Sequence, residues 1–386
     1  MTRLPLAGLK VLDLGIGGVG PWAASQLAQM GACVLKVEAP NEFILQVLPT
    51  WRGLTTTYAC LNVAKHSARL NLKDPTDRER AWTLIDGADV IIENFRAGAM
   101  ERLGFGFDAV TARNRRVVYC SSSGFGSRGP MAGLACTDPH MQAFSGFASL
   151  NGVATGERVR YYAAIDLYTS ALIVDAVLAG LLDRDRTGLP QRIEMTMLGA
   201  ATTLTLTQCA ELFAGGPPPR PLGARGRHSA PDGVFRAADG DLALGAENND
   251  EFAALCSALD RPDLMADRRF SDQRSRLDSA QELFDEIQQT LARLPVDWWL
   301  AALSRAGVRC ARVHADHETV AHRDTWAAGH VRELVVKDVG TLVSAGVPWE
   351  FQGMPSAVAR APRPGQDTEL VASEPARAWS LLEALD

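Results

Sequence analysis

Lysine is scarce in this chain: only five of its 39 basic residues are lysines, and the rest are arginines. Acidic residues outnumber basic ones by 45 to 39, so the formal net charge is −6. Proteins that bind nucleic acid usually carry an excess of positive charge that neutralises phosphates, and this chain has none. We therefore expect no nucleic-acid partner.

Paired cysteines are missing as well. The seven cysteines are scattered and none forms a CxxC pair, which argues against a disulfide framework and favours reduced thiols in a cytoplasmic protein. The most apolar segment, 163–182, contains Asp166 and Asp175, so we expect no membrane span. The first residues also lack the apolar core of a signal peptide.

Several catalytic signatures do not occur: the sequence has no GxSxG, P-loop or HExxH motif. His314, His317 and His322 lie close together beside Asp316, but their spacing is not that of a standard zinc site. We expect these histidines to be solvated at the surface, and we expect the protein to bind no metal ion.

What the sequence does contain is the alternation of strand and helix that is typical of a parallel sheet. Residues 9–14 and 33–38 predict buried strands, and a helix over 21–30 lies between them. Further strands are expected at 89–94 and 116–121, and further helices at 81–85, 108–114, 139–150, 167–182 and 191–213. The fold class is therefore α/β with a parallel sheet.

A stretch rich in proline and glycine, 214–223, is the best candidate for a linker. Residues 1–213 before it would form the large domain. The segment 224–320 after it begins with a hairpin that has an Asp239-Gly240 turn and continues with charged, amphipathic helices. These features predict a smaller α+β domain.

The run Gly15-Ile16-Gly17-Gly18-Val19-Gly20 is a formal GxGxxG between a predicted strand and a predicted helix, and Glu38 follows about 20 residues later. This is the pattern of a dinucleotide site, where glycines let a pyrophosphate approach backbone N–H groups. Pro21 removes one such N–H group, and no later residues suggest hydride chemistry. An NAD(P)-dependent oxidoreductase and a tight strand–helix crossing both remain as interpretations.

Asp166 stands at the start of the long apolar helix. A carboxylate in this place is most often an N-cap. It is also a place where the helix dipole and free N–H groups would keep a carboxylate ionised, as a nucleophile requires. The residues alone leave both roles open.

A set of motifs recurs in order along the chain, in the segments 8–14, 20–38, 88–104, 124–130, 138–146, 186–194 and 235–242. These motifs resemble those of the class III CoA-transferases, the family of formyl-CoA and carnitine CoA-transferases and of 2-methylacyl-CoA racemases. The resemblance implies a Rossmann-like large domain built from both chain ends, so that 321–386 would return to it. It also implies an interlocked homodimer or an assembly with a homologous subunit.

The resemblance assigns roles to individual residues. The family's catalytic aspartate lies about 20 residues before an R-x-T/S-G segment, a position that Asp166 holds here. Arg225 and Arg227 stand where formyl-CoA transferases have a glycine loop, and they are candidates to pair with a substrate carboxylate. The family's CoA contacts transfer best to Val19 (through its backbone), Leu70, Lys73, Asn94, Phe95 and Arg102.

The implied substrates are an acyl-CoA and a carboxylic acid, with coenzyme A as substrate and product and no tightly bound cofactor. The implied reaction passes through an aspartyl mixed anhydride and an aspartyl-CoA thioester on Asp166. The family's racemases carry a histidine where this chain has Thr137, and a glutamate where it has Asn248 beside Glu247. Without the histidine base, transfer is favoured over racemisation. A racemase, an oxidoreductase and a non-catalytic partner subunit are the alternatives.

Overall fold

The computed structural model describes residues 3–40, 49–152 and 160–385. The chain divides into two compact units, and one of the boundaries between them, after Gly216, falls within the stretch rich in proline and glycine. The large unit comprises Met1–Phe147, Tyr161–Gly216 and Arg323–Asp386, and the small unit comprises Ala148–Arg160 and Pro217–His322.

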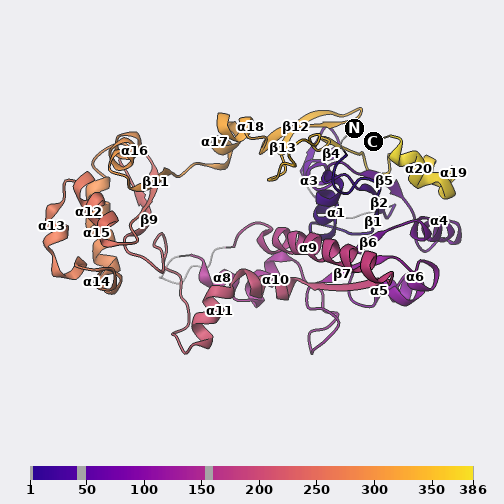
Figure 1. Ribbon diagram of the computed structural model, residues 1–386, viewed down its shortest axis with the longest axis horizontal. Helices are drawn as coiled ribbons and strands as arrows, with labels where there is room; N and C mark the ends of the chain where they lie inside the picture. The colour runs from indigo at the N-terminus through magenta and orange to yellow at the C-terminus, as the bar shows by residue number, and fades with distance from the viewer. Residues whose placement is uncertain (1–2, 41–48, 153–159, 386) are drawn as a thin grey trace. The chain divides into compact units, whose positions relative to one another are not determined.

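A six-stranded parallel sheet forms the centre of the large unit (Figure 1). In spatial order its strands are β5 (His66–Arg69), β2 (Cys33–Glu38), β1 (Lys10–Asp13), β6 (Val90–Glu93), β7 (Val118–Ser123) and β8 (Gln191–Thr196). The chain builds outward from β1 on one side and then resumes at β6 on the other. Such a reversal places a ligand crevice at the carboxyl ends of the two central strands. The predicted α/β class with a parallel sheet is confirmed.

Helices pack on both faces of this sheet because successive strand residues point to opposite sides. On β1, Val11 joins the core formed with α1 (Val19–Gln29) and α9 (Ala164–Thr187), and Leu12 joins the opposite core with α4 (Pro75–Asp86). The other described helices of the large unit are α3 (Thr56–Leu61), α5 (Ala99–Leu103), α6 (Phe107–Arg113), α7 (Asp138–Phe144), α10 (Met197–Leu204), α11 (Leu206–Phe213), α18 (Arg323–Ala327), α19 (Thr368–Ser373), η2 (Pro375–Arg377) and α20 (Ala378–Glu383).

Helix α9 is the one helix of the described chain that is long and apolar enough, by composition, to cross a membrane. In the structure it is a core helix, since Ile173 and Val177 are fully buried in the core that α9 shares with α1. Gly180 brings α9 close to the sheet: a Cβ there would lie 3.1 Å from side-chain atoms of Val118 and of Ile193.

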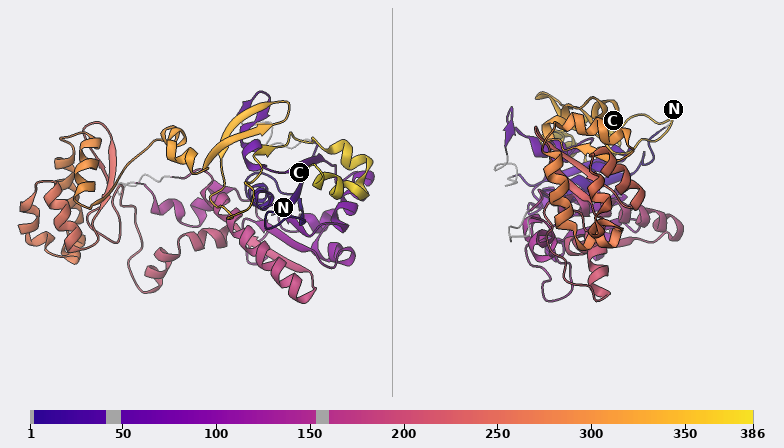
Figure 2. Two further views of the ribbon diagram at one scale, coloured as in Figure 1. Left: turned by 45° about the horizontal axis from the view of Figure 1, so that its top comes forward. Right: turned by 90° about the vertical axis from the view of Figure 1, so that its left-hand side faces the viewer.

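The last part of the chain lies beside the first part, as Figures 1 and 2 show for the yellow helices α19 and α20. The indole nitrogen of Trp379 donates to the carbonyl oxygen of Leu84 (3.0 Å), and the backbone nitrogen of Ser67 donates to Asp367 (2.9 Å). Small strands complete the unit: β3 (Thr50–Trp51), β4 (Leu54–Thr55), β12 (Val331–Val336), β13 (Gly340–Ala345) and β14 (Arg360–Ala361).

The small unit has its own core. The predicted hairpin is present as β9 (Asp232–Arg236) and β10 (Asp241–Gly245), and β11 (Arg309–Arg312) extends it to three strands. Its described helices are α12 (Asn249–Ala258), α13 (Pro262–Ala266), η1 (Arg268–Phe270), α14 (Gln273–Asp278), α15 (Ala280–Leu291), α16 (Val296–Arg305) and α17 (Asp316–Ala321), and α8 (Phe147–Leu150) spans the unit boundary.

Two predicted helices are wrong in part. The segment 191–213 begins with strand β8, because Ile193 and Met195 pack toward the core while Arg192 and Glu194 are exposed, which is the period of a strand. The segment 139–150 is two short helices, α7 and α8, separated by a turn at Gly146, whose φ is +82°. Strand β5 was not predicted.

Candidate active site

The glycine-rich loop between β1 and α1 lies at the point where the strand order reverses. It folds tightly on itself: a Cβ on Gly15 would lie 2.9 Å from the Cα atom of Gly20. The side chain of Asn94, just after β6, binds both backbone groups of Ile16. Its Oδ1 accepts from the nitrogen (2.6 Å) and its Nδ2 donates to the oxygen (2.8 Å). The loops that follow the two central strands are thereby joined.

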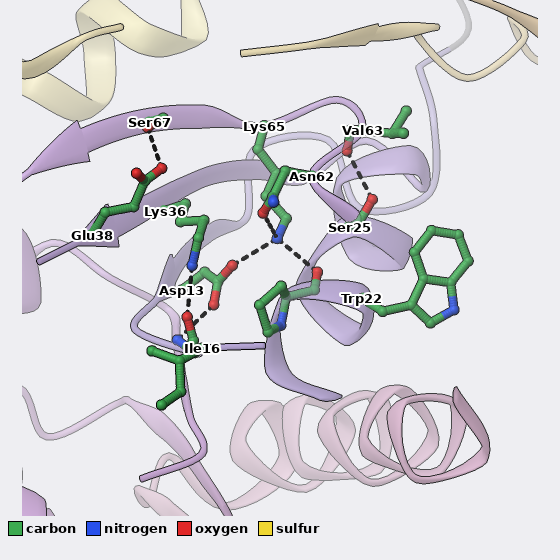
Figure 3. Close-up of polar contacts among 12 residues, drawn as sticks. Asp13, Ile16, Trp22, Ser25, Lys36, Glu38, Asn62, Val63, Lys65 and Ser67 are labelled. Atoms are coloured by element: carbon green, nitrogen blue, oxygen red, sulfur yellow. Dashed lines mark hydrogen bonds and ion pairs between the residues drawn. The ribbon is translucent and has the colours of Figure 1, made fainter. Parts of the chain in front are cut away.

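Buried charged side chains anchor this loop (Figure 3). Asp13 accepts a hydrogen bond from the nitrogen of Gly15 (2.8 Å), and Lys65 donates to Asp13 (2.6 Å) and to the oxygen of Pro21 (2.6 Å). Lys36 donates to the oxygen of Gly15 (2.6 Å). Burial lowers the pKa of Lys65 to about 8, although Asp13 counteracts this effect. Burial opposes ionisation of Asp13, but the charges of Lys65 and Lys36 hold its pKa below the usual value.

Glu38 does not have the role that a dinucleotide site would give it. Its side chain is buried and accepts hydrogen bonds from the hydroxyl groups of Tyr58 (2.5 Å) and Ser67 (2.7 Å). A ribose-binding carboxylate must be open to the ligand. The interpretation of Gly15–Gly20 and Glu38 as an NAD(P) site is therefore wrong.

Asp166 is the third residue of α9 and not its N-cap, so the N-cap interpretation of this residue is wrong. The N-cap position is held by Ala163, which has a left-handed backbone (φ +52°) and no side-chain acceptor. The missing acceptor comes from Asp138 at the start of α7, whose Oδ1 accepts from the nitrogens of Ile165 (2.8 Å) and Asp166 (3.1 Å). The sequence did not reveal this role, because the two aspartates are 28 residues apart.

The carboxylate of Asp166 lies directly against the glycine-rich loop. A Cβ on Gly18 would lie only 2.8 Å from Oδ2 of Asp166. The φ of Gly18 is −93°, which suits any residue, so glycine is needed here for space. Gly18 is also the N-cap of α1, and as a glycine it has no side chain that could cap the helix. The carboxylate of Asp166 thus lies beside the N-terminal, positive end of α1.

Burial raises the pKa of Asp166 to about 7, and the nearby charge of Asp138 raises it further in the same direction. This corrects the expectation that its helical position alone would keep it fully ionised. A pKa near 7 means that both the protonated and the ionised form of this carboxyl group exist near neutral pH.

Comparison with known proteins identifies the protein family that has this fold and site. The sequence profile of CoA-transferase family III matches residues 6–368. The chain belongs to CoA-transferase family III. It is therefore an enzyme, as the resemblance in its motifs predicted.

Individual relatives of this CoA-transferase support the same family assignment. It is 33% identical over 310 residues to an acetyl-CoA:oxalate CoA-transferase from Acetobacter aceti, which covers 79% of each chain. It is 30% identical over 355 residues to a succinate–glutarate CoA-transferase from Agrobacterium fabrum, covering 88% of this chain and 87% of the relative. The crystal structure of a CAIB/BAIF family protein from Brucella suis superposes with a TM-score of 0.86 at 26% identity, covering 97% of this chain and all of the other.

The residues predicted to bind CoA follow the carboxyl edge of the sheet. They lie after β5 (Leu70 and Lys73), at the first position of α1 (Val19), and after β6 (Asn94 and Phe95, with Arg102 in α5). Their accessibility differs. Leu70 and Val19 are buried, and the amide of Asn94 is already bound to Ile16, whereas the side chains of Lys73 and Arg102 are exposed.

Arg225 and Arg227 lie in the small unit. Arg227 donates to the oxygen of Arg220 (3.0 Å), and Arg225 pairs with Gly233 through its backbone. Their pairing with a substrate carboxylate stays a prediction.

The positions that carry the racemase bases have other contacts here. The hydroxyl of Thr137 lies 2.7 Å from Nδ1 of His140, and Asn248 caps α12 by accepting from the nitrogen of Glu251 (2.9 Å). His314 and His322 lie with ring centres 5.9 Å apart. No group of three potential ligands among the described residues could hold a metal ion.

Replacing Gly18 with alanine tests the contact with Asp166. The new Cβ would displace the carboxylate, and we expect kcat to fall by about 100-fold, since a misplacement of this size commonly costs that much. The free energy of unfolding should change by about 1 kcal/mol or less, because only the end of a side chain must move. Steady-state kinetics and urea unfolding measure the two effects. Gly240→Ala is the control, as its Cβ would lie at an ordinary 3.4 Å from Val296. Equal activity in both variants would contradict the prediction.

Proposed function

We propose that this enzyme moves CoA from an acyl-CoA thioester to a carboxylic acid, with Asp166 as the covalent nucleophile. The observation that carries the proposal is the position of the Asp166 carboxylate: it is half-buried at the carboxyl edge of the sheet and in contact with Gly18 of the loop at the reversal point. The names of the relatives, which transfer CoA between carboxylic acids, support the same reaction.

The steps balance without any oxidant or metal. One carboxylate oxygen of Asp166 attacks the thioester carbonyl, the C–S bond breaks, and CoA leaves as a thiolate, which produces a mixed anhydride. The thiolate then attacks the aspartyl carbonyl and releases the donor acid as its carboxylate, which leaves an aspartyl-CoA thioester. The acceptor carboxylate then attacks the aspartyl-CoA thioester and releases the CoA thiolate, which produces a second mixed anhydride. The thiolate attacks the acceptor's carbonyl in this anhydride, which forms the new acyl-CoA and regenerates the carboxylate of Asp166.

The surroundings of Asp166 suit this chemistry. An anhydride is hydrolysed by water, so the nucleophile must be partly shielded from solvent, as Asp166 is. The N-terminus of α1, whose N-cap residue Gly18 has no side chain, offers dipoles for the oxyanion that forms at each attack. Thr137 cannot act as a base in place of the racemase histidine, which favours transfer over racemisation.

Asp166→Asn is expected to reduce transferase activity by about 1,000-fold or more, because an amide is a poor nucleophile. Wild-type enzyme incubated with an acyl-CoA and trapped with hydroxylamine or borohydride should carry a modification on Asp166 in peptide mass spectra. Asp175→Asn is the matched control, since Asp175 lies on the same helix and is exposed. If no panel of acyl-CoA donors modifies Asp166, the covalent mechanism fails.

For the acceptor we propose a dicarboxylic acid, with Arg225 and Arg227 binding its second carboxylate. The names of two relatives mention oxalate and glutarate, both dicarboxylates. We expect the double variant Arg225→Ala/Arg227→Ala to raise KM for a dicarboxylic acceptor by about tenfold. KM for a monocarboxylic acid should not change. Arg305→Ala, an exposed arginine of the same unit, is the control. An unchanged dicarboxylate KM would refute this assignment.

We also propose that the enzyme is a homodimer, interlocked as in the family that it resembles. Helix α11 supports association, because none of its residues is buried and Phe213 is 85% exposed. Such apolar surface commonly marks a contact with another chain. Sedimentation should give twice the chain mass of 41.5 kDa, and Phe213→Asp should weaken association while Phe213→Leu does not. A monomeric wild-type protein would contradict the proposal.

A further inference from the structure

A second carboxylate, Asp138, lies beside the nucleophile, and the reaction above does not use it. Its side chain is only 6% exposed. The donors that bind it are neutral N–H groups: Oδ1 accepts from the nitrogens of Ile165 and Asp166, and Oδ2 accepts from Nε2 of Gln142 (2.5 Å). A buried carboxylate normally accepts hydrogen bonds that offset the free-energy cost of removing it from water. Here two of these hydrogen bonds come from backbone N–H groups in the first turn of α9, so Asp138 holds that turn in place.

Gln142 determines how Asp138 is oriented. The amide of Gln142 is fully buried and also binds both backbone groups of Tyr161: Oε1 accepts from the nitrogen (3.0 Å), and Nε2 donates to the oxygen. Both hydrogens of Nε2 are therefore used, one for Tyr161 and one for Asp138. The amide cannot be turned over without losing these bonds, so Gln142 fixes the direction of the Asp138 carboxylate.

We propose that Asp138 is a positioning residue for the nucleophile: aimed by Gln142, it fixes the start of α9 so that the carboxylate of Asp166 lies against Gly18. This inference rests on the proposed function of Asp166. The N-cap residue Ala163 has no side-chain acceptor, so no local group can do the same.

The charge of Asp138 adds a second effect. It opposes ionisation of Asp166, and this repulsion disappears when Asp166 becomes a neutral anhydride or thioester. The repulsion therefore favours formation of the covalent intermediates. The other titratable group that faces Asp166 is Cys136, whose pKa is raised by burial and by both aspartates, so that it is a neutral thiol near pH 7.

The test compares wild type, Asp138→Asn and Asp138→Ala in single-turnover release of CoA, with mass spectra of the Asp166 adduct as a second readout. The wild-type rate should fall as the pH drops through about 7, because protonated Asp166 is not a nucleophile. In Asp138→Asn the charge is gone, so this acidic limb should move to lower pH. In Asp138→Ala we expect kcat to fall by about 100-fold with KM for acyl-CoA unchanged.

Asp272→Asn is the matched control, because Asp272 caps α14 in the small unit by accepting from the nitrogen of Ser275 (2.9 Å). A wild-type acidic limb and a wild-type rate in Asp138→Asn would overturn the inference. The inference would also be overturned if Asp138→Ala changed only KM. It would be overturned as well if Asp272→Asn lost activity to the same extent. If Asp138→Ala does not fold, the isosteric asparagine variant decides alone. Failure of the proposed function is distinct, since the wild-type enzyme itself would then form no adduct.

Discussion

The close approach of the Asp166 carboxylate to the backbone of Gly18 is the constraint on which the site depends. A side chain of any size at position 18 would meet Oδ2 of Asp166. The contact joins two segments that the chain builds separately, the loop after β1 and the first turn of α9. For the nucleophile role that we propose for Asp166, both segments must be held in place, because a displacement of even 1 Å costs much of the rate.

Each side of this contact has its own support. On the loop side, backbone groups are bound by the buried side chains of Asp13, Lys36 and Lys65. Asn94, at the end of the neighbouring strand, binds Ile16. On the helix side, Asp138 supplies the cap. Buried charges of this kind are costly unless every partner is present, so the loss of any one of these partners should be strongly destabilising.

The electrostatics of the site follow from the same packing. Burial removes water from Asp166 and raises its pKa to about 7, and Asp138 adds repulsion. A fully solvated aspartate would be ionised at neutral pH but weakly nucleophilic and surrounded by water that destroys an anhydride. Near neutral pH the carboxyl group of Asp166 is thus partly protonated, and it is partly shielded from water, which is what the nucleophile role that we propose requires.

The sequence by itself determined the parallel sheet, the glycine-rich loop, the hairpin of the small unit and, through its motifs, the family and Asp166 as candidate nucleophile. These features depend on local periodicity or on residues close together along the chain. Only the tertiary structure decided that Asp138 and not Asp166 caps α9, that Asn94 binds the loop, that Glu38 is buried, and that 191–196 is a strand. The physical reason is that hydrogen bonds between residues 28 or 78 positions apart leave no pattern in the local sequence. The same holds for the burial of a side chain by distant segments.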